Sequence, residues 1–145
     1  MSNLVLELRS GETMIVNGAP IRFRTKTRLE LTAHARFLFG KQIMPPGEAD
    51  SPARRIYFAL QTAYIGTEEE RRAGLESARD LIVAFQHATT SSLAREILDR
   101  AMAAADADDC YQALKYVRRV IRHEDMILGR NEPAPPTLHS YPSPS

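Results

Sequence analysis

The residues best suited to chemistry in this sequence are cations at alternate positions of the segment IRFRTKTRLEL, residues 21–31. In a β-strand successive side chains point to opposite faces, so one face would carry these cations at intervals of roughly 6.6 Å. That interval is near the phosphate spacing of an extended single strand of nucleic acid. We therefore predict that cations of this N-terminal part contact RNA phosphates. The first choices are Arg22, Arg24, Lys26 and Arg28, followed by Arg9, Arg36 and Lys41.

An interpretation of the basic segment without any ligand, and a second candidate surface, both remain open. Cations on an edge strand also protect a sheet from aggregation, without any ligand. Phosphate contacts give affinity and salt dependence but carry no sequence information. Reading RNA bases would need help from Phe37, Phe39 or Asn17, because Phe23 is on the parity that should face the core. A second basic group, at Arg118, Arg119 and Arg122, is the next candidate surface.

A search for catalytic residues finds little. Gly40-Lys41 lacks the upstream glycine and the following Ser or Thr of a phosphate-binding loop. The residues 123–125 place a histidine beside two carboxylates, but adjacent helical positions point in different directions. The four histidines are too far apart for metal-ligand spacing, and they are His34, His87, His123 and His139. We predict no catalytic residue, no metal site and no cofactor.

The acidic run at the start of the last predicted helix needs no ligand. Asp106, Asp108 and Asp109 have the positions of helix-capping residues. Cys110, next to them, is predicted to be a small buried side chain.

Composition and charge bound the class of protein. The 145 residues suit one ordinary domain, and 43% hydrophobic residues are enough for a core. Residues 1–44 hold seven basic and three acidic side chains, a net +4, so the rest of this +1 chain carries −3. Such a basic part favours an anionic partner. One cysteine and no apolar run of membrane-spanning or signal length lead us to expect a cytoplasmic protein without membrane association.

The N-terminal part reads as β-structure. Leu4, Leu6 and Leu8 alternate with Val5, Glu7 and Arg9, the period of a half-buried strand, and residues 13–16 are rich in β-formers. Asn17-Gly18 then predicts a tight hairpin, because both central residues of a type I′ turn need positive φ. The strand from 21 to 31 would complete a three-stranded meander with Ile21, Phe23, Leu29 and Leu31 in the core. A further short strand is favoured around Phe37 and Phe39, although a short helix is the alternative.

Beyond Met44-Pro45-Pro46-Gly47 the pattern becomes helical. Four amphipathic helices are predicted, capped by Ser51 with Pro52, by a Thr67–Glu70 capping box, by one of residues 90–92, and by Asp108 or Asp109. Their predicted inward side chains include Leu93 and Leu128. We therefore predict an α+β fold: a β-meander (1–44) packed on about four helices (51–129), with a disordered Pro-rich tail (130–145).

The first predicted helix carries more large apolar groups than one face can hold. Residues 53–60, ARRIYFAL, indicate a helix buried on two sides. The second side could be covered by the rest of this chain or by another subunit, so a homo-oligomer stays open.

Three strings of this sequence together resemble the FlbT family of flagellin regulators. They are LVLELRSGETMIVNGAPIRF, TRLEL and PARRIYFALQTAYI, and the resemblance extends to about Arg122. Residues from Leu4 to about Val16, with their Gly-Glu-Thr turn, are also similar to the first strands of the carbon-storage regulators, a family of small RNA-binding β-proteins.

The resemblance implies a post-transcriptional regulator of flagellum biogenesis that associates with the 5′ untranslated region of flagellin mRNA and promotes its degradation. Some family members behave as activators, so the sign of regulation stays open. Flagellin and the companion regulator FlaF are further partners that the family implies. An alternative is a protein-binding adaptor that acts through flagellin or FlaF and affects mRNA only indirectly; its motivation is the apolar excess from Ile56 to Tyr64.

Overall fold

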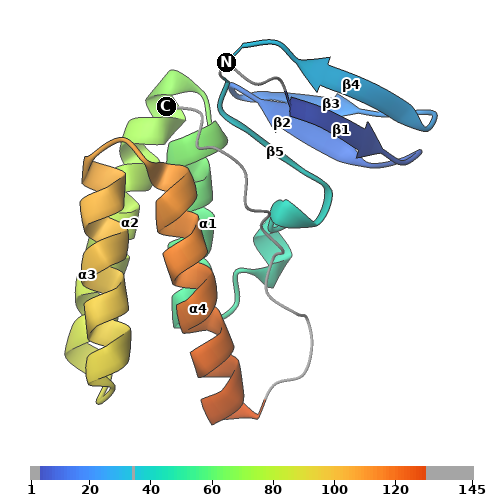
Figure 1. Cartoon of the computed structure of the whole chain (residues 1–145). Coiled ribbons are helices and arrows are strands. Elements are labelled where there is room, and N and C mark those ends of the chain that lie inside the picture. Colours follow the sequence, from blue (N-terminus) through green and yellow to red (C-terminus); the bar gives the residue numbers. More distant parts are fainter. Residues whose placement is uncertain (1–3, 34, 130–145) are drawn as a thin grey trace.

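The computed structural model describes residues 4–33 and 35–129 as an α+β fold, which confirms the predicted class (Figure 1). The strands are β1 (Leu4–Leu8), β2 (Thr13–Val16), β3 (Ala19–Arg22), β4 (Thr27–Leu31) and β5 (Phe37–Phe39). Two short 3-10 helices follow, η1 (Gly40–Gln42) and η2 (Pro46–Glu48). The helices are α1 (Pro52–Ile65), α2 (Glu68–Ala88), α3 (Ser92–Asp106) and α4 (Cys110–Leu128). The predicted tail, residues 130–145, lies outside the described residues.

All strand pairs are antiparallel, but their order differs from a simple meander. β1 pairs with β4, whereas β2 is the central strand of a second sheet with the order β3-β2-β5. The segment 21–31 is therefore shared between two sheets and bends at residues 23–26. The bend is held by the turn after β1, because Gly11 N–H donates to Phe23 O at 2.6 Å and Phe23 N–H donates to Glu12 O at 3.0 Å.

The three-stranded sheet lies between two apolar cores. One of its faces packs on the β1–β4 pair, in a small cluster of Leu6, Leu8, Met14 and Phe37. Strand register puts Ile15 and Leu38 side by side on the other face, and both pack against the helical core. Figure 1 shows the strands gathered at one end of the helices.

Three of the four core residues predicted for segment 21–31 are half-buried, and one is wrong. Phe23, Leu29 and Leu31 pack against the small cluster. Ile21 is 42% exposed, because β3 is an edge strand whose four residues are all exposed. Among helical positions, Leu93 and Leu128 are also exposed rather than inward, since each stands at an end of its helix.

Local capping signals set the helix boundaries. The side chains of Ser51, Thr67, Ser91 and Asp109 each accept a backbone N–H at the start of their helix. Thr67 and Glu70 form the predicted capping box. The four helices start where these polar residues stand, as predicted. None of the helices within the described residues is long and apolar enough to cross a membrane.

Helix α1 is the centre of the larger core. It packs against α2, α4 and β5, and Ile56, Tyr57 and Leu60 are fully buried. Gln61 lies on the same helix and holds the strand part in place: its side chain accepts from Met44 N–H at 2.8 Å and donates to Met44 O at 3.0 Å. The predicted two-sided burial of this helix is thus met within the chain.

Candidate nucleic-acid interface

Four of the predicted RNA-contacting cations gather at one end of the sheets, and we call this group the basic end: Arg9, Arg22, Arg24 and Lys26. All four side chains are exposed, and no ion pair of the described residues includes any of them. Ser10 Oγ donates to Arg24 O at 2.9 Å, so the turn that follows β1 and the bend before β4 form one backbone unit. The basic end therefore presents several guanidinium and ammonium groups on a fixed frame.

One acidic side chain, that of Glu12, lies in the turn of this frame. Glu12 is half-buried, and its Oε1 accepts the backbone N–H of Arg9 at 2.6 Å. Because this carboxylate is occupied by a backbone donor, it competes weakly with phosphate for the cationic side chains.

Arg28 does not continue the basic row, so the predicted strand face with four cations in line is wrong. Its partner across the β1–β4 pair is Glu7, and the neighbouring pair on the same face is Val5 with Glu30. Opposite charges side by side on adjacent strands attract each other. The outer face of β4 is therefore close to neutral, and Arg24 and Lys26 lie before this strand, in the bend.

Arg36 and Lys41 lie in two other places. Lys41 is exposed on η1. Arg36 is half-buried and lines a polar pocket near the tip of the β2–β3 hairpin, together with Arg71 from α2. Nothing in the sequence predicts that Arg36 and Arg71 line the same pocket. The two arginines are separated by 34 residues, and both look like ordinary surface residues.

The aromatic side chains considered for base reading are inside the sheet part. Phe37 is buried and Phe39 is half-buried, and their rings stack on each other with centroids 6.4 Å apart. Asn17 is exposed at the hairpin tip with φ 49°. The strand part thus offers cations for phosphates but no exposed aromatic platform from these two rings.

The second basic group is only partly at the surface. Arg119 and Arg122 are exposed, and Arg118 is half-buried. Burial, and then the charge of Arg122, lower the pKa of the Arg118 guanidinium. On this part of α4, two exposed cations, Arg119 and Arg122, therefore remain available to a ligand.

The carboxylates of residues 124–125 build a joint between α4 and α1 rather than a reactive site. Glu124 accepts from Ser51 Oγ and from Ala53 N–H, and it thereby supplies an acid to the start of α1, whose own first turn has none. Asp125 receives two parallel hydrogen bonds from Arg54, at 2.6 and 3.1 Å. Arg54 is 1% exposed. Sequence reasoning missed this buried ion pair.

The remaining reactive groups are also structural. Burial raises the pKa of the Cys110 thiol to about 11, with Asp108 as the next cause, so the thiol is protonated at neutral pH. Among residues 4–33 and 35–129, no group of three or more His, Cys, Asp or Glu side chains could hold a metal ion.

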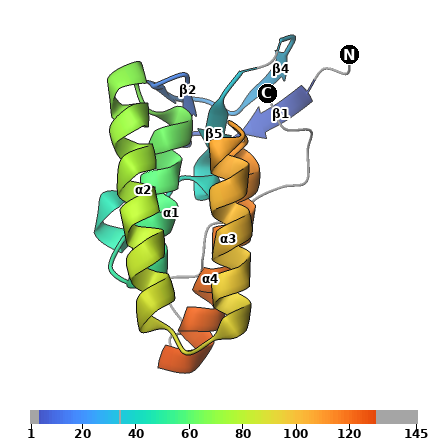
Figure 2. The same ribbon diagram turned by 90° about the vertical axis from the view of Figure 1, so that its left-hand side faces the viewer.

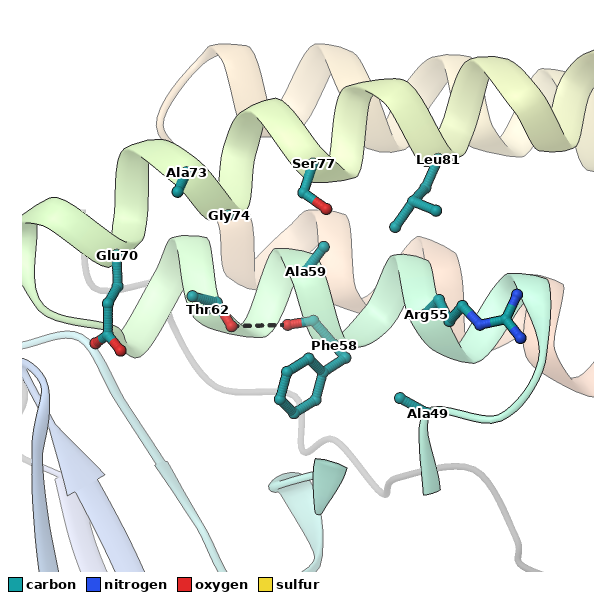
Figure 3. Close-up of a pocket in the computed structure, with 10 residues that line it drawn as sticks. All are labelled: Ala49, Arg55, Phe58, Ala59, Thr62, Glu70, Ala73, Gly74, Ser77 and Leu81. Carbon is teal, nitrogen blue, oxygen red and sulfur yellow. Dashed lines mark hydrogen bonds between the residues drawn. The ribbon is translucent and has the colours of Figure 1, made fainter. Parts of the chain in front are cut away.

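An apolar groove of about 410 Å³ runs between α1 and α2 (Figure 3). Phe58, Ala59 and Leu81 contribute apolar surface to it. Figure 3 shows Glu70 at one end and Arg55 at the other. Gly74, on the lining, lets the two helices approach closely: a Cβ at this position would lie 2.8 Å from a backbone nitrogen of α1.

Comparison with known proteins gives a consistent result. The family model described as "Flagellar protein FlbT" matches residues 4–128. A protein of Agrobacterium fabrum named "Probable flagellum biosynthesis repressor protein FlbT" is 31% identical over 140 residues, covering 94% of this chain and 91% of the relative. A protein of the same name from Mesorhizobium japonicum is 31% identical over 137 residues, covering 92% and 90%. No solved structure is significantly similar to this chain.

Proposed function

We propose, from the premise that this chain belongs to the FlbT family of flagellar proteins, that it represses flagellum biosynthesis by binding the 5′ untranslated region of flagellin mRNA. In this proposal the bound message is then degraded by cellular nucleases. FlbT proteins are regulatory repressors and not enzymes, which agrees with the absence of a predicted catalytic constellation in the sequence. The chain would act in the cytoplasm, where the message is.

The observation that supports RNA binding is the basic end. Its cations are exposed and unpaired among the described residues, and its backbone is held by the hydrogen bonds between residues 10–12 and residues 23–24. Such a surface gives affinity through phosphate contacts and counterion release. Four contacts to a single strand would give a slope of log K against log salt of about −3.

The test is a filter-binding titration of the flagellin leader RNA with the purified chain at several salt concentrations. Charge reversal of Arg24→Glu with Lys26→Glu should abolish retention at physiological salt, because two attractive contacts become repulsive. The circular dichroism spectrum should not change, since both side chains are exposed in the bend.

The matched control is Arg119→Glu with Arg122→Glu, which changes the net charge equally on another exposed surface. If only the control variant loses binding, the α4 surface is the interface and the basic end is not. If the wild-type chain retains no RNA even at low salt, direct RNA binding is refuted.

The groove between α1 and α2 favours a second candidate, the adaptor acting through flagellin or FlaF. Most apolar side chains that motivated this alternative are in the core, since Ile56, Leu60 and Tyr64 are buried. Phe58 is half-buried and lines the groove, so apolar surface remains for a partner helix. Phe58→Ala should weaken capture of FlaF or flagellin in a titration with purified partner and leave leader RNA retention unchanged. Equal capture by the variant would argue against the groove.

A further inference from the structure

A polar pocket of about 570 Å³ lies between the tip of the β2–β3 hairpin and the turn that joins α1 to α2. Residues 17–19 of the hairpin form one wall, and residues 66–68 form the other. Arg36 and Arg71 complete the lining. Figure 2 shows β2 beside the start of α2.

The walls of this pocket are fixed by backbone contacts. A Cβ on Gly18, which has φ +87°, would lie 3.2 Å from the backbone of Thr67. Asn17 N–H donates to Arg36 O at 2.9 Å, and Arg36 N–H donates to Asn17 Oδ1 at 3.2 Å. The hairpin tip is therefore pressed against the helices, and the backbone of Arg36 is tied to it.

The guanidinium of Arg36 lacks a partner within the described part of the chain. Its Nε is buried and has no hydrogen-bond acceptor there, and none of the ion pairs found there includes Arg36. The positive charge of Arg36 opposes the rise in the pKa of Tyr64 and of Cys110. Its side chain therefore lies near both groups. Buried charged donors are normally satisfied. The nearby Tyr64 Oη is also buried and makes no hydrogen bond within the described residues, so an external acceptor would satisfy Arg36.

Arg71 adds a second fork to the same pocket. Its Nε donates to Ala63 O at 2.9 Å, which fixes the direction of the side chain. Its Nη2 lies 3.4 Å from Asp108, whose side chain is 85% exposed. An ion pair this long and exposed contributes little, so a stronger anion can replace it. Among the lining residues, two arginines stand against one acidic residue, Glu68.

We propose that this pocket binds one backbone phosphate of an RNA chain through Arg36 and Arg71. The inference rests on the proposed function, which supplies RNA as the ligand. Planar arginine forks bind phosphate oxygens with two parallel hydrogen bonds. The pocket and the basic end are at opposite ends of β2, whose four residues span roughly 13 Å. A few nucleotides lying along the hairpin could reach both.

The first test follows the Arg36 Nε–Hε signal in ¹H–¹⁵N spectra of the full chain, assigned with an Arg36→Lys variant. The leader RNA is added in one titration and inorganic phosphate in another, each against chloride at equal ionic strength. The RNA should shift the Arg36 Nε–Hε signal, because a phosphate oxygen would become the acceptor of a donor that has none within the described residues. No shift with RNA, or a shift with inorganic phosphate only, overturns the RNA assignment.

The second test measures leader binding by Arg36→Gln and Arg71→Gln variants. Each should lose at least about tenfold in affinity, the effect of one charge-assisted contact, and the double variant should reduce the salt slope by about 0.7, the value for one phosphate. The control is Arg79→Gln, which removes an equal charge from an exposed residue of α2 already paired with Asp106. If both pocket variants bind like the control while wild-type binding is intact, the pocket is refuted and the proposed function stands. If the wild-type chain binds no RNA, both fail.

Discussion

The buried ion pair between Arg54 and Asp125 gives the sharpest stability prediction. Asp125→Ala removes two charge-assisted hydrogen bonds from the Arg54 guanidinium, whose side chain is 1% exposed. Breaking a buried pair by removing one partner costs about 3–5 kcal/mol, because the remaining charge stays desolvated. With a urea m value of about 2 kcal/mol/M, the unfolding midpoint measured by circular dichroism should fall by about 2 M.

The chain contains a matched control for this prediction. Arg79 and Asp106 are also 2.6 Å apart, but their side chains are 49% and 47% exposed. Asp106→Ala should therefore cost at most about 1 kcal/mol. Equal losses for the two alanine variants would refute the argument that burial, and not distance, determines the strength of these pairs.

A double variant separates the lost charge pair from lost packing. Arg54→Met combined with Asp125→Leu replaces both charges with apolar groups of similar size, and such replacements are often neutral. The double variant should thus be clearly more stable than Asp125→Ala alone. If it is less stable, the cost lies in the shape of the joint and not in the loss of the Arg54–Asp125 pair.

Three further predictions follow from close contacts and burial. Gly74→Ala should destabilise by about 1–2 kcal/mol despite alanine's better helix propensity, because its Cβ would meet the backbone of α1 at 2.8 Å; a rise in the urea midpoint would contradict this. Gly18→Ala should cost more than Gly11→Ala, since both have positive φ but only Gly18 faces a backbone within 4 Å; thermal melts with the order reversed would disprove it. Iodoacetamide at pH 8 should alkylate Cys110 about 100-fold more slowly in the folded chain than in urea, as its pKa rises from 9.0 to about 11. Folding favours the protonated thiol. Its contribution to the free energy of unfolding, about 3 kcal/mol, is present below pH 9 and is lost as the pH rises from 9 to 11. Equal alkylation rates would refute the shift.

Much of the helical part could be predicted because its signals are local. A cap such as Ser51 or Thr67 bonds to a backbone group three residues away, so the relevant atoms are close in any chain that starts a helix there. The same holds for the Asn17-Gly18 turn, where positive φ at both residues is a property of two adjacent positions.

The prediction of one continuous basic strand was wrong. Alternate side chains share a face only as long as the strand is unbroken. Segment 21–31 satisfies the alternation, yet β3 pairs with β2 and β4 pairs with β1. The bend between them, at residues 23–26, is stabilised by hydrogen bonds from Phe23 to residues 11 and 12. No residue type inside the segment predicts this bend. As a result Arg24 and Lys26 lie at the end of the sheets, and Arg28 faces Glu7.

The sequence by itself determined the α+β class, the helix starts, the hairpin turn and the family resemblance, because each depends on neighbouring residues or on a string of letters. Tertiary structure alone decided the strand order, the joint of Arg54 with Asp125 and the placement of Arg36 and Arg71 on one pocket. These contacts join residues far apart in the chain, 71 positions in the case of Arg54 and Asp125. Side chains so far apart in the chain are brought together only by the packing of whole helices and strands. A local sequence pattern does not predict this packing.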